Sequence, residues 1–171
     1  MRDLPKDSGK YLSALKNIHS LELFVVKIQH ISEEGFRICF SAFRETLTHL
    51  TLESFNTSFS AFVTLVDYFP NITTLRLGWF NMKPDEGPVP PSPRPLRGRI
   101  HLSRPSRHCV VFFDRLAKLD PEYEELVLES EHRMETVLVE SLLRLGASTV
   151  KYLRLTAKFK CEYPCENPSL P

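Results

Sequence analysis

Glycine is scarce in this chain of 171 residues, with only six positions. None of the six belongs to a Walker loop, a G-x-G-x-x-G turn or a G-x-S-x-G elbow. Phosphate-binding loops and nucleophile elbows need such glycines, because their backbone must turn sharply and approach the ligand closely. The sequence therefore gives no sign of a nucleotide-binding enzyme or an α/β-hydrolase. We expect no cofactor and no catalytic residues.

Metal-ligand patterns are missing as well. The six histidines form no pair at zinc-binding spacing, and H-E-x-x-H is absent. Cys161 and Cys165 have three residues between them but no second pair to complete a zinc site. Cys39 and Cys109 fall in apolar patterns of helical spacing, which predicts free, buried thiols. His108 and Cys109 form no catalytic dyad, since neighbours on a helix point apart.

The chain also lacks long apolar runs and an excess of charge of one sign. No stretch approaches the ~18 apolar residues of a membrane-spanning helix, and the polar first ten residues are unlike a signal peptide. Lys plus Arg number 22 and Asp plus Glu 21, a net charge of +1. This balance predicts neither nucleic acid nor an anionic membrane as a partner. We expect a cytoplasmic or nuclear protein with reduced cysteines.

What the sequence does contain is one six-residue template, apolar-x-x-Leu-x-Leu, repeated along the chain. The last position is Leu all six times, and the position two before it is Leu five times and Ile once. The copies end at Leu23, Leu52, Leu77, Leu102, Leu128 and Leu155. The steps of 29, 25, 25, 26 and 27 residues between these leucines are typical of leucine-rich repeats.

The template has a simple physical basis. Side chains alternate between faces along a strand, so its last two apolar positions point into the same core. One repeat cannot bury this pair alone, but stacked repeats form a parallel ladder over one continuous core. We therefore predict an α/β fold, a short leucine-rich-repeat solenoid of about six strand–helix repeats with a parallel concave sheet.

The elements follow from the apolar spacing. Strands are expected near residues 21–25, 49–53, 74–77, 97–102, 125–129 and 151–156. Between them, apolar residues recur three and four positions apart, as on a helix face. The predicted faces are Phe36, Phe40, Phe43 and Leu47; Phe59, Phe62, Val63, Val66 and Phe69; Val110, Phe113, Leu116 and Ala117; and Met134, Val137, Leu138, Leu142 and Leu145. Predicted caps are Ser32, Thr57 or Ser58, and Ser106 at helix starts, and Gly146 as a left-handed C-terminal cap.

One repeat replaces its helix with prolines. Six of the thirteen prolines fall between Pro84 and Pro95, which predicts an extended convex loop over residues 83–96. Its P-x-x-P spacings could instead serve a polyproline-reading domain. Leu96 can take the apolar place that Arg97 occupies in the template. The predicted organisation is an N-terminal tail at 1–14, a repeat domain at 15–160 and a C-terminal tail at 161–171.

The chain resembles the leucine-rich-repeat region of fungal F-box proteins. The resemblance rests on L-T-H-L-T-L-E-S-F-N-T-S-F-S-A-F-V-T-L-V-D-Y-F-P-N-I-T-T-L-R-L, on R-P-L-R-G-R-I-H-L and on F-F-D-R-L-A-K-L-D-P-E-Y-E-E-L-V-L, and it covers roughly residues 15–162. In that family an F-box docks an adaptor of a ubiquitin ligase and the repeats hold the substrate. Only fourteen residues precede Leu15, too few for an F-box, so adaptor docking is not carried over. The asparagine that many such repeats place three residues after the last Leu is absent, which predicts irregular turns.

Two columns of residues flank the strand leucines and should face the concave surface. Arg76, Arg99, His101, Arg154 and Tyr152 would form a mainly basic strip with an aromatic edge, next to the acidic Glu53, Glu125 and Glu129. Arg and Tyr are frequent anchors of protein interfaces, so we predict a protein-binding site here. An ordinary solvated sheet face is the alternative.

The sequence thus favours a non-catalytic protein-interaction module that resembles the substrate-recognition repeats of an F-box-type receptor. The partner protein is unknown, and ubiquitin-ligase components are candidates only through an F-box that this chain lacks. The alternatives are a nonfunctional fragment of such a family member and a hydrolase that uses a cleft histidine such as His101.

Overall fold

The computed structural model describes residues 14–24, 33–54, 56–79, 81–82, 96–105, 109–134, 136–146 and 149–159. Most of the predicted N-terminal tail, the whole C-terminal tail, nearly all of the proline-rich loop, and the proposed caps Ser32 and Ser106 lie outside these residues. None of the helices in the described ranges is long and apolar enough to cross a membrane.

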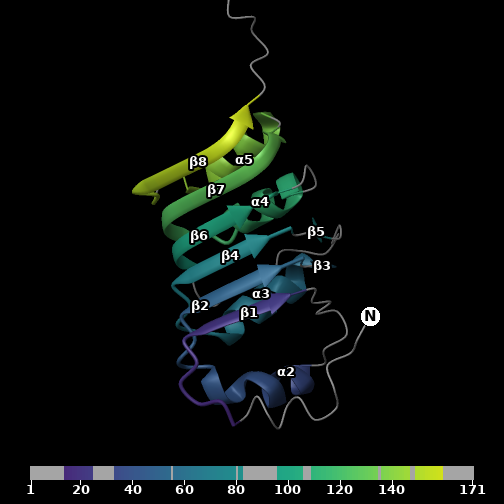
Figure 1. The fold of residues 1–171 in the computed structure, drawn as a ribbon, viewed down its shortest axis with the longest axis vertical. Coiled ribbons are helices and arrows are strands. Elements are labelled where there is room, and N and C mark those ends of the chain that lie inside the picture. The colour runs from purple at the N-terminus through teal and green to yellow at the C-terminus, as the bar shows by residue number, and fades with distance from the viewer. Residues whose placement is uncertain are drawn as a thin grey trace, which may run out of the picture.

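Six strands form one all-parallel sheet, in which the strand of each repeat pairs with the strand of the following repeat (Figure 1). The strands are β1 (Ser20–Phe24), β2 (His49–Glu53), β4 (Thr74–Gly78), β6 (Arg97–Ser103), β7 (Glu122–Met134) and β8 (Tyr152–Phe159). All six predicted strands are therefore present. The two last strands are longer than predicted, because β7 and β8 pair again at Arg133–Lys158 and Met134–Phe159 beyond a break in register.

The template leucines stack in register, as predicted. Leu21, Leu50, Leu75, Ile100, Leu126 and Leu153 form one row across the sheet, and Leu23, Leu52, Leu77, Leu102, Leu128 and Leu155 form the second. In the four inner strands these side chains are at most 2% exposed. The two rows therefore form one face of a continuous core.

Helices cover that face and alternate with the strands (Figure 1). They are α2 (Glu33–Phe40) with the 3-10 helix η2 (Ser41–Phe43), α3 (Phe59–Tyr68), α4 (Cys109–Ala117) and α5 (Thr136–Gly146). The helix layer is rich in aromatic rings. Phe62 and Phe112 meet edge to face at 5.2 Å, which ties α3 to α4 across the place where the proline-rich repeat has no described helix.

Three predictions about the helices are wrong. Leu47 does not extend the first helix: η2 ends at Phe43, whose carbonyl accepts from the N–H of Leu47, and Leu47 is buried in the turn before β2. Leu47 is also the first apolar position of the template that leads into β2, so the chain must leave the helix before this residue. Met134 is the last residue of β7, and Val137 is exposed in the first turn of α5. Gly146 is still part of α5 and does not follow it as a cap.

The other predicted details have mixed outcomes. Ser58 is the N-cap of α3, since its hydroxyl accepts from the N–H of Ala61 at 3.3 Å, whereas Thr57 is a buried residue of the short strand β3 (Asn56–Thr57). Cys39 and Cys109 are thiols that form no disulfide, as predicted, and Cys109 is buried while Cys39 is half-buried.

The turns after three strands are regular, contrary to the prediction. Ser54, Trp79 and Arg104 each lie two residues after the template's last Leu and have φ of 52°, 47° and 53°. Their N–H groups donate to the carbonyls of Gly78, Ser103 and Glu129 in the next repeat, at 2.9, 3.2 and 2.8 Å. This backbone ladder replaces the missing asparagines. A second, two-stranded sheet continues it, in which β3 pairs with β5 (Asn81–Met82).

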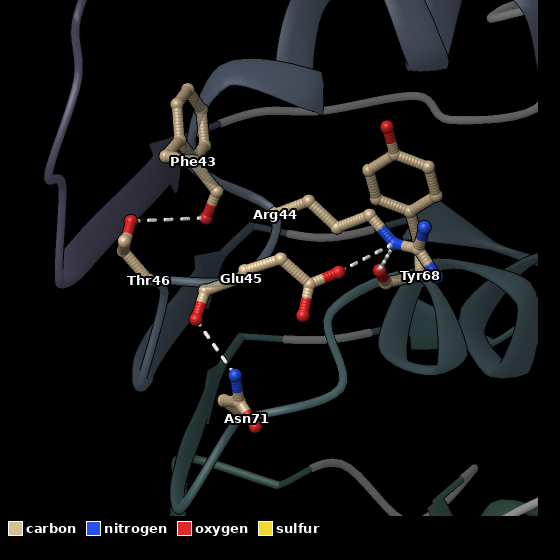
Figure 2. Close-up of polar contacts among 6 residues, drawn as sticks. All are labelled: Phe43, Arg44, Glu45, Thr46, Tyr68 and Asn71. Atoms are coloured by element: carbon tan, nitrogen blue, oxygen red, sulfur yellow. Dashed lines mark hydrogen bonds and ion pairs between the residues drawn. The ribbon is translucent and has the colours of Figure 1, made fainter.

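Polar contacts also tie successive repeats together at the opposite ends of the strands (Figure 2). Asn71 Nδ2 donates to the carbonyl of Glu45 at 2.7 Å, and Arg44 Nε donates to the carbonyl of Tyr68 at 3.0 Å. The Arg44 guanidinium lies 5.4 Å from the centre of the Tyr68 ring. The end of α3 is thus fixed against the turn that leads into β2.

Gly98 marks the irregular repeat. Its φ is +85°, and a bulge follows it in the pairing of β6 with β7. Leu96 packs against the core while the Arg97 side chain is exposed, so Leu96 takes the apolar place of the template, as predicted. A side chain at position 98 would overlap the backbone carbonyl oxygen of Thr73.

We expect Gly98→Ala to lower the free energy of unfolding by roughly 1–3 kcal/mol, because alanine disfavours positive φ and backbone atoms cannot move aside. Gly78→Ala is the matched control. The three atoms nearest to a side chain there all belong to the carboxylate of Glu53, the far end of a flexible side chain. Urea unfolding should give the larger loss at position 98, and equal losses would contradict this account of the bulge.

Tyr123 is fully buried, and its hydroxyl has no hydrogen-bond partner among the described residues. Burial raises the pKa of Tyr123 well above its ordinary value of 10.0. Above pH 10 the unfolded chain loses this proton while the folded chain keeps it, so stability falls as pH rises.

Tyr123→Phe should therefore leave stability at neutral pH unchanged or raise it by up to about 1 kcal/mol, because no hydrogen bond is lost. Above pH 10 the variant should lose less stability than the wild type. Chemical unfolding at pH 7 and pH 10.5 measures both effects. Tyr152→Phe, at an exposed tyrosine, is the control, and an identical pH dependence in wild type and Tyr123→Phe would refute the assignment.

Candidate protein-binding face

The side of the sheet opposite the helices is here called the open face. The register places on it the two predicted columns: Ser20, His49, Thr74, Arg99, Glu125 and Tyr152, and beside them Glu22, Thr51, Arg76, His101, Val127 and Arg154. The residues predicted for the binding site thus come from neighbouring strands of one surface, with Glu53 at the end of β2.

Three of the four basic residues in the predicted strip lie beside carboxylates of neighbouring strands. Arg99 Nε lies 2.5 Å from Glu125 Oε2 on the adjacent strand, and Arg76 Nε lies 3.8 Å from Glu53 Oε1. His101 Nε2 is 3.0 Å from Glu129 Oε2, close enough for an ion pair but not aligned for a hydrogen bond. The acidic neighbours compensate the cations, so the centre of the face is not a free positive patch.

The column ends differently at β8. Arg154 is exposed and forms no ion pair or hydrogen bond with any described residue, and Tyr152 is 54% exposed. Next to Arg154 on β7 lies Val127, an apolar residue that is only 7% exposed. This edge of the open face therefore presents one unpaired cation beside an accessible aromatic ring.

The prediction missed the most distinctive residue of this surface, the single tryptophan. Trp79 follows β4 in the left-handed turn and is 58% exposed, and the Arg104 guanidinium from the equivalent turn lies 5.6 Å from its ring centre. A hollow of about 400 Å³ opens beside them, lined by Glu53, Arg76, Trp79, Ser103, Arg104, Glu129, Ser130 and Thr156. The signal was available, since Trp79 and Arg104 occupy the same position of successive repeats.

An exposed tryptophan at positive φ is unusual, because bulky side chains are disfavoured in the left-handed region. Such strain is most often found where a protein binds something. The hollow lies at the carboxyl ends of parallel strands, where the turns of successive repeats converge. Carboxylates, guanidinium groups and an indole thus lie together around the hollow at the carboxyl ends of the strands.

The described surroundings of His101 bear on the hydrolase alternative. A base needs a nucleophile and an orienting group within hydrogen-bond reach. Among the described residues, Glu129 is the only polar partner recorded for His101. The same ranges contain no group of three His, Cys, Asp or Glu side chains arranged to hold a metal ion.

Comparison of the chain with protein-family models, with curated proteins and with solved structures found no match. The site must therefore be interpreted from its own geometry.

The Arg99–Glu125 pair gives a test of that geometry. In a double-mutant cycle with alanine at both positions, we expect a coupling of about 0.2–1 kcal/mol in the free energy of unfolding, reduced by added salt. The Arg97–Glu122 pair is the matched comparison, because it spans the same two strands but is more exposed. A coupling at Arg99–Glu125 that is absent, or insensitive to salt, would mean that the pair does not persist in solution.

Proposed function

We propose that this chain is a non-catalytic protein-binding module of the leucine-rich-repeat type, which holds its partner on the open face. The observation that carries the proposal is the group formed by Trp79, Arg104 and the hollow at the carboxyl ends of the strands. Large amphipathic side chains fixed on a rigid support lose little entropy on binding, and Trp and Arg are enriched among residues that dominate interfaces.

The leucine-rich-repeat interpretation is supported by the repeat length and by the two in-register apolar rows. The recurring left-handed turn adds to this, because it gives successive repeats the same exit from the strand. In such stacks the strand face is the usual binding surface, since every repeat contributes side chains to it at a fixed spacing.

The chemistry of the face suggests a polar protein surface or segment as the partner. Arg76 and Arg99 are already compensated by carboxylates, so a strongly acidic ligand would have to displace existing ion pairs. A partner that brings an apolar side chain to Trp79 and hydrogen-bonding groups to the ion pairs would displace none. Interfaces of this kind combine a few buried anchors with a polar rim.

The more specific proposal is a substrate receptor of a ubiquitin ligase. It rests only on the resemblance of residues 47–77 and of the two later stretches to fungal F-box proteins. In that family an F-box, and not the repeats, docks the adaptor, so the role would also require an F-box.

The test is quantitative affinity purification of the tagged full chain from its own cells. We expect the combination Arg76→Ala, Trp79→Ala and Arg99→Ala to reduce recovery of the main partner at least tenfold, as loss of an interface anchor does. Val111→Ala with Lys118→Glu is the matched control, because both residues are exposed on the helix side. Melting temperatures of the purified variants establish that each is folded.

The outcomes separate the versions of the proposal. Full retention of the partner by the open-face variant would refute the binding face, and recovery of chaperones alone would favour a nonfunctional fragment. A partner set that lacks an adaptor and a cullin would remove the ligase role but keep the binding module.

A further inference from the structure

Both edges of the six-stranded sheet are unpaired within the described part of the chain. β1 pairs only with β2, and β8 only with β7. The leucine rows continue to these edges but are less well covered there. Leu153 is 44% exposed, and Leu21, Leu23 and Leu155 are half-buried. Unpaired strands with accessible leucines are templates for further pairing.

Other apolar side chains gather at the same two ends. Nine large hydrophobic residues of the described chain are exposed, and seven of them lie at the ends of the stack. Leu15 precedes β1 in the chain, Phe24 is the last residue of β1, and Ile38 lies on α2. Val137 and Leu143 lie on α5, and Tyr152 and Leu153 lie on β8. Clustered exposed hydrophobic residues of this kind mark contact surfaces.

The two ends have complementary outlines. Figure 1 shows α2 at the foot of the stack, beyond β1, so the helix layer extends past the sheet there. At the other end β8 is the last described element, and no described helix follows it to cover Leu153. A projecting helix at one end thus corresponds to an uncovered strand at the other.

Two opposite charges at the sheet edges would fix the register in which β8 of one copy meets β1 of another. Glu22 on β1 and Arg154 on β8 occupy the same column of the open face, and both are exposed. Neither forms an ion pair or a hydrogen bond with another described residue. If β1 of a second copy lies parallel to β8 with the leucine rows aligned, Leu21 meets Leu153, Leu23 meets Leu155, and Glu22 lies opposite Arg154.

We propose that copies of this chain associate head to tail, with β8 of one copy pairing in parallel with β1 of the next. The contact is heterologous, so each added copy leaves a further edge free, and the proposed product is an open stack whose length grows with concentration. This inference goes beyond the proposed function, because it uses the sheet edges and not the Trp79 hollow. In such a stack the open faces of successive copies would lie side by side, which favours partners with repeated binding sites.

Charge reversal at the two positions gives a sharp test by sedimentation equilibrium of the full chain. The wild type should show an average mass that rises with concentration past the dimer. Glu22→Arg sets Arg against Arg154, and Arg154→Glu sets Glu against Glu22, so each variant alone should associate roughly three- to tenfold more weakly. Mixed in equal amounts, the two variants should regain wild-type association, because every contact in an alternating stack again joins Arg to Glu.

Four outcomes would overturn the proposal. One is a wild type that stays monomeric at the highest concentration at which it remains in solution. The second is an average mass that stops at the dimer. The third is Glu22→Arg associating like the wild type, which is expected if two β8 strands pair with each other. The fourth is a mixture that associates no better than its components.

Controls keep these outcomes interpretable. Lys118→Glu changes an exposed charge away from both edges and should associate like the wild type, as should Trp79→Ala on the open face. Circular dichroism establishes that each variant is folded. If a charge-reversed variant is not, Glu22→Gln and Arg154→Gln replace the pair. Each should then weaken association less. In their mixture, Arg154 of the Glu22→Gln copy again meets Glu22 of the Arg154→Gln copy, whereas the reverse contact joins Gln to Gln. Mixing should therefore restore every second contact but not the long stack.

Discussion

The fold depends on the stacking of two apolar rows, one from each strand position that faces the helices. A leucine fully buried in this way contributes about 1.5–3 kcal/mol relative to an exposed one. No repeat can obtain that contribution alone, because its pair of leucines is covered only when strands lie on both sides and a helix lies below. In the four inner strands this condition is met, whereas Leu153 at the last strand remains accessible. Because each leucine pair needs neighbours on both sides, the first and last described strands keep leucines that are only partly covered.

The stack fixes the turns, and the turns create the candidate site. When strands are held in register, the residues that leave them must follow the same path in each repeat. Ser54, Trp79 and Arg104 accordingly share a left-handed conformation and donate to the next repeat. This path carries Trp79 outward beside Arg104. An unfavourable backbone conformation for a large side chain is tolerated because the ladder of hydrogen bonds defines it on both sides.

The open face illustrates how register controls electrostatics. The sequence predicts a mainly basic strip on this face. Parallel pairing, however, brings Glu125 next to Arg99 and Glu129 near His101. Among the described residues of the face, the basic residue that keeps an uncompensated charge is Arg154 at the β8 edge, and Glu22 is its acidic counterpart at the β1 edge. The positive character predicted for the whole strip is thus confined to Arg154 at the β8 edge of the described sheet.

The sequence alone determined the strands, their order, their parallel direction and the two columns of the open face. Period-two alternation and a leucine pair every 25 to 29 residues leave one arrangement that buries every pair, and the columns follow from that register. It did not determine where Leu47 or Met134 belongs, because an apolar residue at a boundary satisfies both a helix face and a strand. Only the tertiary structure decided the left-handed turns, the exposure of Trp79 and the pairing of the charges. These depend on contacts between residues about 25 positions apart, and local propensity says nothing about such contacts.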